Sequence, residues 1–594
     1  MKRMLSALLV LFLLLGTFPL AAIAYDEAAP YEAAQEVTAP ADDAGECADD
    51  PDDDESDDNY IADDDDDEPT DNDDPADNDD ADDEDYEEPE ELSGRTLTDI
   101  FPDANLAQAV AWENGWELDT IVTQEMLDGI IWLGAGWWGI SNLQGMQYLT
   151  NLEELSLGGN QIQDFSPLSG LANLQWLDLS GSQISNLAPL AGLTNLMGLG
   201  LGDNQISDLS PLAGMTNLTS LNLSYNQIRD LSPLAGMANL THLYLDDNQI
   251  SDLSPLTGLP NLEWLEIGNN QAVTLASLTE LPNLGGLSVR NSRISDLTPL
   301  AGMTNLWWLD ASENQITNIA PLAGMTSLWD VDLSNNQITN IAPLANMPHL
   351  GGARLDNNQI SNLAPLAGAT HLHWLSLGGN QISDIAPLAG LALLSWIHLP
   401  NNQITNIAPL AGLTGLWWIN LNNNRISDLS PLAGTSLESL QLSGNRISDL
   451  SPLADMAQMG WVDAANQEIT LSPVPRANPF RLRNPIRQVD GSLVAPDSLS
   501  HSGSYTAPNL TWANLSANVS SVSFEFTSYL DAGDSFAYFS GTVTVPIGGP
   551  AAPLTSDDTR LPWLSLIFSA IGLTVTAAFL LIPNAKVKAD SAAQ

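Results

Sequence analysis

The chain has 594 residues, of which 16 are Lys or Arg and 76 are Asp or Glu, so its formal net charge is −60. Such a chain lacks the clustered cations that displace counterions from phosphate backbones, and this argues against nucleic-acid binding. It has one cysteine, so no intramolecular disulfide can stabilise the fold.

Residues 1–24 have the three parts of a secretory signal. Two basic residues precede an apolar run over 4–15, and small residues form an Ala-x-Ala site that ends at Ala24. A bacterial lipoprotein would carry a cysteine after the apolar run, and Tyr25 stands there instead. We therefore expect export without lipidation at this end.

Residues 25–92 form an acidic tail. Between positions 26 and 91 there are 35 acidic residues and no Lys or Arg. Because large apolar residues are scarce in this stretch, burial cannot offset its ordering entropy, and we expect it to be disordered. Its acidic runs lack the glycine and glutamate spacing of a calcium loop, so it is interpreted as a solvated spacer, with weak cation binding as the alternative.

Residues 93–148 are predicted to form a helical N-terminal cap, with helical patterning around 104–112 and 122–127. A solenoid needs such a cap because its end faces cannot otherwise be buried.

A fixed period governs residues 149–473, where 15 units of about 22 residues follow one another. One unit has Leu218, Leu221 and Leu223 before Asn226, with Ile228 after it. This is the pattern of a leucine-rich repeat, in which a short parallel strand precedes a turn and a convex segment. Proline after each unit's turn disfavours a regular helix, so we expect extended or 3-10 turns on the convex side.

An asparagine recurs at the end of each strand segment and is expected to bond the backbone of the turns inside the coil. Ser182 and Ser292 replace it at two positions, and the last two units are read as one residue shorter. The predicted structural ladder consists of Asn160, Asn204, Asn226, Asn248, Asn270, Asn314, Asn336, Asn358, Asn380, Asn402, Asn424, Asn445 and Asn466.

The repeats and their flanking segments resemble the internalins, leucine-rich surface proteins of Gram-positive bacteria. The resemblance covers about residues 95–547, and it extends to a module over 474–548 that is similar to the immunoglobulin-like domain closing the internalin array. It is carried by the cap 97–103, the entry 145–149, the repeated Asn-Gln-Ile-Ser-Asp-Leu-Ser-Pro-Leu-Ala-Gly, the exit 466–470, and the segments 493–496, 503–506 and 539–543. It implies an all-β adjoining domain and a concave repeat face that binds a partner protein.

The chain departs from this family in its anchor, because it lacks a Leu-Pro-x-Thr-Gly sorting motif. Residues 563–582 carry no charge and are long enough for one transmembrane helix, which the stalk 549–562 precedes. Two lysines in the tail 583–594 place that tail in the cytoplasm by the positive-inside rule. We expect a single-pass cell-membrane protein with its ectodomain outside.

Residues six, four and two positions before each ladder asparagine alternate with buried leucines and should face the concave side. Trp307, Trp329 and Trp417 lie seven positions before the asparagine. Trp374, Trp396 and Trp418, at the sixth position of consecutive units, are expected to stack as a ladder about 5 Å apart. The predicted partner-binding residues are Trp176, Asp178, Tyr244, Trp264, Glu266, Trp308, Asp310, Asp332, Arg354, Trp374, Trp396, His398 and Trp418.

No zinc-protease pair, phosphate loop or nucleophile elbow occurs, so we expect no enzyme, no cofactor and no metal site. His349 and His371 share one repeat position, but no carboxylate or cysteine at a ligand spacing accompanies them. Three readings remain: an adhesin-like binder of an extracellular protein, a glycan-binding module that uses the tryptophans, and a structural spacer of the cell envelope.

Overall fold

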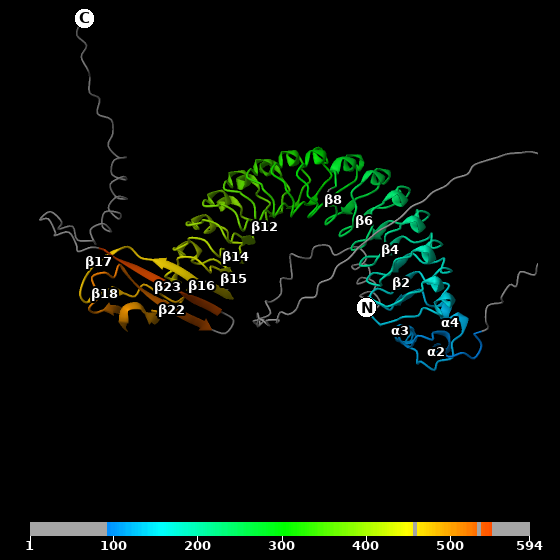
Figure 1. Cartoon of the computed structure of the whole chain (residues 1–594), viewed down its shortest axis with the longest axis horizontal. Coiled ribbons are helices and arrows are strands. Elements are labelled where there is room, and N and C mark those ends of the chain that lie inside the picture. Colours follow the sequence, from blue (N-terminus) through cyan, green and yellow to red (C-terminus); the bar gives the residue numbers. More distant parts are fainter. Residues whose placement is uncertain (1–91, 272, 455–459, 532–535, 549–594) are drawn as a thin grey trace, which may run out of the picture.

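The computed structural model describes residues 92–271, 273–454, 460–531 and 536–548. They form an arch in which strands line the inner, concave side and short helices the outer, convex side (Figure 1). The predicted signal, nearly all of the acidic tail, the stalk, the transmembrane segment and the cytoplasmic tail lie outside these ranges. Within them, no helix has the length and hydrophobicity needed to cross a bilayer.

Three α-helices begin the described chain, namely α2 (Leu97–Ile100), α3 (Ala104–Asn114) and α4 (Gln124–Asp128). The Asp103 side chain caps α3 by accepting hydrogen bonds from two backbone amides, and Gly115 ends the helix in the left-handed region at φ 69°. Leu106 and Val110 of α3 are fully buried in the same core as the repeats. The cap therefore closes the apolar end of the solenoid.

Sixteen short strands follow, each hydrogen-bonded in parallel to the next. The middle residue of each three-residue strand is buried in the solenoid core. The strands are β1 (Trp132–Gly134), β2 (Glu154–Ser156), β3 (Trp176–Asp178), β4 (Gly198–Gly200), β5 (Ser220–Asn222), β6 (His242–Tyr244), β7 (Trp264–Glu266), β8 (Gly286–Ser288), β9 (Trp308–Asp310), β10 (Asp330–Asp332), β11 (Gly352–Arg354), β12 (Trp374–Ser376), β13 (Trp396–His398), β14 (Trp418–Asn420), β15 (Ser439–Gln441) and β16 (Trp461–Thr470).

The convex side consists of 3-10 helices, which confirms the expectation drawn from the prolines. Most of them begin at turns in which an aspartate or asparagine side chain accepts a backbone hydrogen bond, as Asp208 does from the Ser210 amide at 2.9 Å. They are η1 (Met146–Tyr148), η2 (Ser166–Leu168), η3 (Ala188–Leu190), η4 (Ser210–Leu212), η5 (Ser232–Leu234), η6 (Ser254–Gly258), η7 (Leu275–Glu280), η8 (Thr298–Leu300), η9 (Ala320–Leu322), η10 (Ala342–Asn346), η11 (Ala364–Gly368), η12 (Ala386–Gly390), η13 (Ala408–Leu410), η14 (Ser430–Leu432) and η15 (Ser451–Leu453).

The asparagine ladder bonds each coil to the preceding one. Asn226 donates from Nδ2 to the carbonyls of Leu201 at 2.9 Å and Leu223 at 3.1 Å, and its Oδ1 accepts from the amide of Ile206 at 2.9 Å. Ser292 reaches only carbonyls, at 3.1 and 3.3 Å from its Oγ. The ladder thus satisfies buried backbone groups that no regular sheet or helix would pair.

The last ladder residue is Gln467, and the prediction of Asn466 was wrong. Gln467 is 1% exposed, donates from Nε2 to the Leu442 carbonyl at 2.9 Å and accepts from the Ile447 amide at 2.9 Å. Asn466 is exposed and adopts a positive φ of 55°. Only the unit that ends at Asn445 is one residue shorter. The next ladder residue follows at the usual spacing of 22 residues, at Gln467.

The chain after the array is all-β. It comprises β17 (Val474–Pro475), β18 (Phe480–Arg483), β19 (Pro496–Leu499), η16 (Ser500–Ser502), β20 (Ser504–Thr506), β21 (Asn509–Trp512), β22 (Ser521–Asp531) and β23 (Phe536–Gly548). β18, β21 and β20 form a separate sheet, whereas β23 pairs in parallel with β16 and antiparallel with β22. The repeat sheet therefore continues directly into the adjoining domain, whose immunoglobulin-like topology stays a prediction.

Candidate partner-binding surface

The predicted binding residues occupy the first and third positions of the concave strands. In β9, for example, Trp308 and Asp310 are half-buried while Leu309 between them is fully buried. The prediction that Tyr244 contacts a partner needs correction, because its side chain is only 4% exposed and burial raises its pKa. It lies within the packed surface and offers a partner little contact area.

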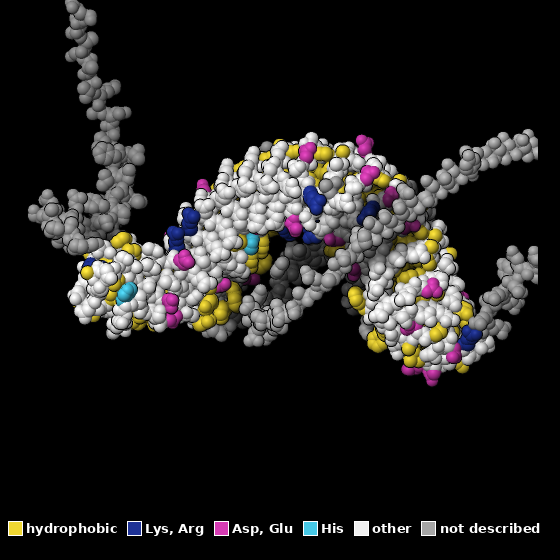
Figure 2. All heavy atoms as spheres, viewed as in Figure 1, with side chains coloured by type: hydrophobic (Ala, Val, Ile, Leu, Met, Phe, Trp, Pro, Cys, Tyr) yellow, Lys and Arg dark blue, Asp and Glu magenta, His cyan; other side chains and the backbone are white. Residues whose placement is uncertain are grey.

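One aromatic cluster lies on β13 and β14. The rings of Trp396 and Trp418 stack with centroids 4.6 Å apart and planes 5° apart. His398 lies nearly parallel to both, at 5.6 Å from Trp396 and 5.9 Å from Trp418. Figure 2 shows apolar side chains exposed on the inner side of the arch in this part of the array.

Trp374 does not extend this stack in the way the sequence suggested. Its indole covers Gly352 of the preceding strand, where an added Cβ would lie 2.0 Å from Cε2 of the ring. The guanidinium of Arg354 packs on the same ring, with Cζ 4.5 Å from the centroid. Glycine leaves room for the indole to lean toward β11, so the expected three-ring ladder is a stacked pair beside a cation–π contact.

A second aromatic cluster spans three strands. Trp264 and Trp308 are 44 residues apart, yet their rings stack at 4.7 Å and 20°. The intervening strand presents Gly286 at the same register, where an added Cβ would lie 2.0 Å from Cε3 of Trp264. We did not predict this pair from the sequence. The signal that could have revealed it is Gly286, which lies between two tryptophans at the same repeat position.

Three further tryptophans precede the strands and are more accessible. Trp307, Trp329 and Trp417 are 39%, 48% and 42% exposed. Trp307 lies 5.6 Å from Trp264, so it extends the second cluster toward solvent. Exposed tryptophans beside charged residues have the composition of binding hot spots.

Carboxylates with raised pKa values lie among these rings. Burial raises the pKa values of Asp330 and Asp332 to about 6 each, although the nearby guanidinium of Arg354 lowers both. Asp310 further raises the pKa of Asp332 by charge repulsion. Arg354 Nη1 lies 3.9 Å from Asp332 Oδ2.

Glu266 belongs to a separate acidic pair near Trp264. Its Oε1 accepts a hydrogen bond from Trp264 Nε1 at 2.8 Å. Burial, with the hydrogen bond and charge of Glu266, raises the pKa of Asp246 to about 8, while the amide of Gly268 donates to Asp246 Oδ1 at 2.5 Å. Asp246, two positions before Asn248, was not among the predicted residues, which were taken only from the positions six and four residues before each ladder asparagine.

The remaining predicted residues, Trp176 and Asp178, lie on β3 near the N-terminal end of the array. Trp176 covers Gly198 of the next strand, and Asp178 accepts hydrogen bonds from the backbone of Ser180 and the hydroxyl of Ser156. The structure therefore groups most predicted residues along β7–β14 and leaves these two apart.

Comparison with known proteins agrees with this architecture. The family model "Leucine Rich repeats (2 copies)" matches residues 150–192, 172–214, 194–236, 238–283, 304–346 and 418–455, and the model "LRR adjacent" matches 491–548. The crystal structure of an internalin, inlF, from Listeria monocytogenes is 36% identical over 63% of this chain and 98% of that chain, with a TM-score of 0.43. The chain belongs to the internalin-like leucine-rich repeat proteins.

Two further relatives define the extent of the match. Internalin H of L. monocytogenes is 37% identical over 86 residues, which are 14% of this chain and 16% of that protein. The functional domain of InlJ from the same species is 22% identical, covers 76% of this chain and 98% of that chain, and superposes with a TM-score of 0.51, which shows the shared fold. The internalin-like chain thus aligns with a small part of this curated relative.

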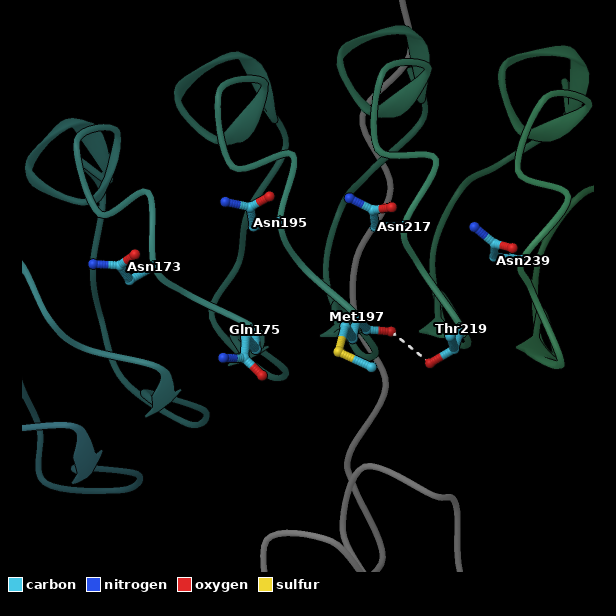
Figure 3. A pocket seen from close by; sticks show the side chains of 7 residues that line it. All are labelled: Asn173, Gln175, Asn195, Met197, Asn217, Thr219 and Asn239. Atoms are coloured by element: carbon cyan, nitrogen blue, oxygen red, sulfur yellow. Dashed lines mark hydrogen bonds between the residues drawn. The ribbon is translucent and has the colours of Figure 1, made fainter.

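The internalin-like array has a second column of asparagines on its lateral face. Each donates from Nδ2 to a carbonyl 23 residues earlier, as Asn195 does to Ala172 at 2.8 Å. Figure 3 shows four of these side chains in a row beside Gln175, Met197 and Thr219, around a shallow groove of about 510 Å³. The members are Asn151, Asn173, Asn195, Asn217, Asn239, Asn261, Asn283 and Asn305.

His349 and His371 occupy the same lateral position farther along the array, with rings 6.4 Å apart. Across the described ranges, no group of three or more His, Cys, Asp or Glu side chains could hold a metal ion. The two histidines lie two and three repeats beyond Asn305, the last amide of this column.

Proposed function

We propose that this internalin-like chain is a non-enzymatic, adhesin-like surface protein that recognises an extracellular protein through its concave face. Export by the N-terminal signal and retention by one C-terminal membrane helix are part of the proposal. The ectodomain then lies outside the cell and the C-terminus in the cytoplasm.

The observation that carries the proposal is the aromatic tract along β7–β14. Indole rings are stacked in two clusters, and Trp307, Trp329 and Trp417 remain 39–48% exposed beside them. Internal packing alone would bury such rings, whereas a partner gains from large apolar surfaces whose rotamers are already fixed by neighbours. Membership of the internalin-like proteins supports the same use of this face.

The test is a binding screen of the full chain against an extracellular-protein array and a glycan array. The triple variant Trp308→Ala, Trp396→Ala and Trp418→Ala, at the first positions of β9, β13 and β14, should lose its protein ligands, because hot-spot truncations cost about 2 kcal/mol or more each. Trp112→Ala is the matched control, since Trp112 is 72% exposed on helix α3 of the cap.

Protein ligands that survive the triple substitution would contradict a concave binding site. Binding only to glycans, lost in the triple variant, would favour the glycan-binding alternative. Added protease should also cleave the ectodomain on intact cells, and full protection there would contradict the proposed location.

A further inference from the structure

Asp330 is a buried carboxylate without a structural task. It is 7% exposed, and its Oδ1 has no hydrogen-bond partner within the described part of the chain. Among the corresponding first strand positions only β2 also holds an acid, Glu154, and the other strands have Trp, Gly, Ser or His, so most repeat strands form without an acid there. Burying an unpaired carboxylate is unfavourable, as the raised pKa of Asp330 reflects.

The neighbours of Asp330 on the adjacent strands are aromatic and acidic. Asp330 lies in register between Trp308 on β9 and Gly352 on β11, and the indole of Trp374 covers that glycine. Asp310, at the third position of β9, adds a carboxylate whose charge acts on Asp330. An acid in register with one indole and close to a second carboxylate favours a cationic group by both charge and cation–π attraction.

The chain already contains one cation in such a setting. Arg354 lies between the carboxylate of Asp332, at 3.9 Å, and the ring of Trp374, at 4.5 Å. On the strand before Asp332, Asp310 and Trp308 provide a further acid and a further indole. Arg354 thus acts on two carboxylates, those of Asp330 and Asp332, and Asp310 on β9 adds a third carboxylate beside them.

We propose that the protein partner inserts an arginine or lysine side chain at this point, against Trp308 and between the carboxylates of Asp310 and Asp330. The inference rests on the proposed function and specifies it, because the concave face then selects a partner segment with an exposed basic residue. The apolar rings provide contact area, and the carboxylates select a basic side chain over a neutral or acidic one.

The experiment is a selection of random heptapeptides displayed on phage against the full chain. Enriched peptides should be rich in Arg or Lys, and the double variant Asp310→Asn, Asp330→Asn should bind them at least about tenfold more weakly, as expected for a lost charged hydrogen bond. The matched control is Asp384→Asn, Asp428→Asn, which removes the same charge from exposed convex turns. Asparagine already makes this turn bond at Asn318.

Urea unfolding of each variant checks that it is folded. A selection without Arg or Lys enrichment overturns the proposal, and so does equal loss of binding in the convex control, which would mean general attraction to an acidic chain. Loss of binding in the triple tryptophan variant without any preference for basic peptides refutes this inference alone. Binding that survives the triple substitution refutes the concave site itself.

Discussion

The assignment of Gln467 to the asparagine ladder can be tested by replacing it with alanine. Its Nε2 approaches the carbonyls of Leu442, Ala464 and Ala465 at 2.9, 3.1 and 3.0 Å, and its Oε1 accepts from the Ile447 amide. Because an amide nitrogen has two hydrogens, these contacts amount to about three hydrogen bonds. At roughly 1 kcal/mol each, Gln467→Ala should lower the free energy of unfolding by about 3 kcal/mol.

Asn466 provides the matched comparison, since it is the adjacent residue and was the predicted ladder member. It is exposed at a φ of 55°, where glycine fits without strain, and its backbone amide donates to Ser540 Oγ. Asn466→Gly should therefore change the free energy of unfolding by no more than about 0.5 kcal/mol.

The assay combines urea unfolding, followed by tryptophan fluorescence, with hydrogen exchange of individual amides. In Gln467→Ala the Ile447 amide loses its acceptor and should exchange faster, whereas in Asn466→Gly it should not. An Asn466→Gly variant as destabilised as Gln467→Ala would refute the corrected register.

Two further predictions concern residues of the concave strands. Gly286→Ala should displace the Trp264 ring, reduce its stacking on Trp308 by about 0.5–1.5 kcal/mol and change the near-ultraviolet circular dichroism, whereas Gly214→Ala, with open space at its Cβ, should not. The pKa of Asp330 is raised in the folded state, so its contribution to stability is present at low pH and is lost as pH rises from about 4 to about 6. Urea unfolding across this range should show Asp330→Asn gaining stability relative to the unsubstituted chain, by at most about 3 kcal/mol, and a constant difference would contradict the raised pKa.

The period of the sequence predicts the solenoid because one chemical constraint recurs in every unit. Each asparagine must reach the same backbone atoms of the preceding coil, so a 22-residue spacing implies a 22-residue strand register. The error at Asn466 arose from preferring residue type over spacing. Glutamine is one methylene longer, yet at position 467 its amide reaches the carbonyls that asparagine reaches elsewhere.

The direction of the concave side chains was harder to predict. A strand pattern shows that Trp374 faces the concave side, but the lean of its ring depends on the size of the residues on both neighbouring strands. Gly352 on one side and Trp396 on the other decide it, and the indole occupies the space above the glycine. The burial of Tyr244 depends in the same way on cross-strand neighbours, which a single unit does not reveal.

The continuity of β16 with β23 has a mechanical consequence. Residues 461–470 and 536–544 pair in parallel, so the array holds β16 at its first residues while a load applied at Gly548 acts on the opposite end of β23. The two strands are then pulled past one another, and their hydrogen bonds resist together instead of opening one at a time. Tension along the molecule would be transmitted across this seam by shear, as the proposed adhesin-like function requires.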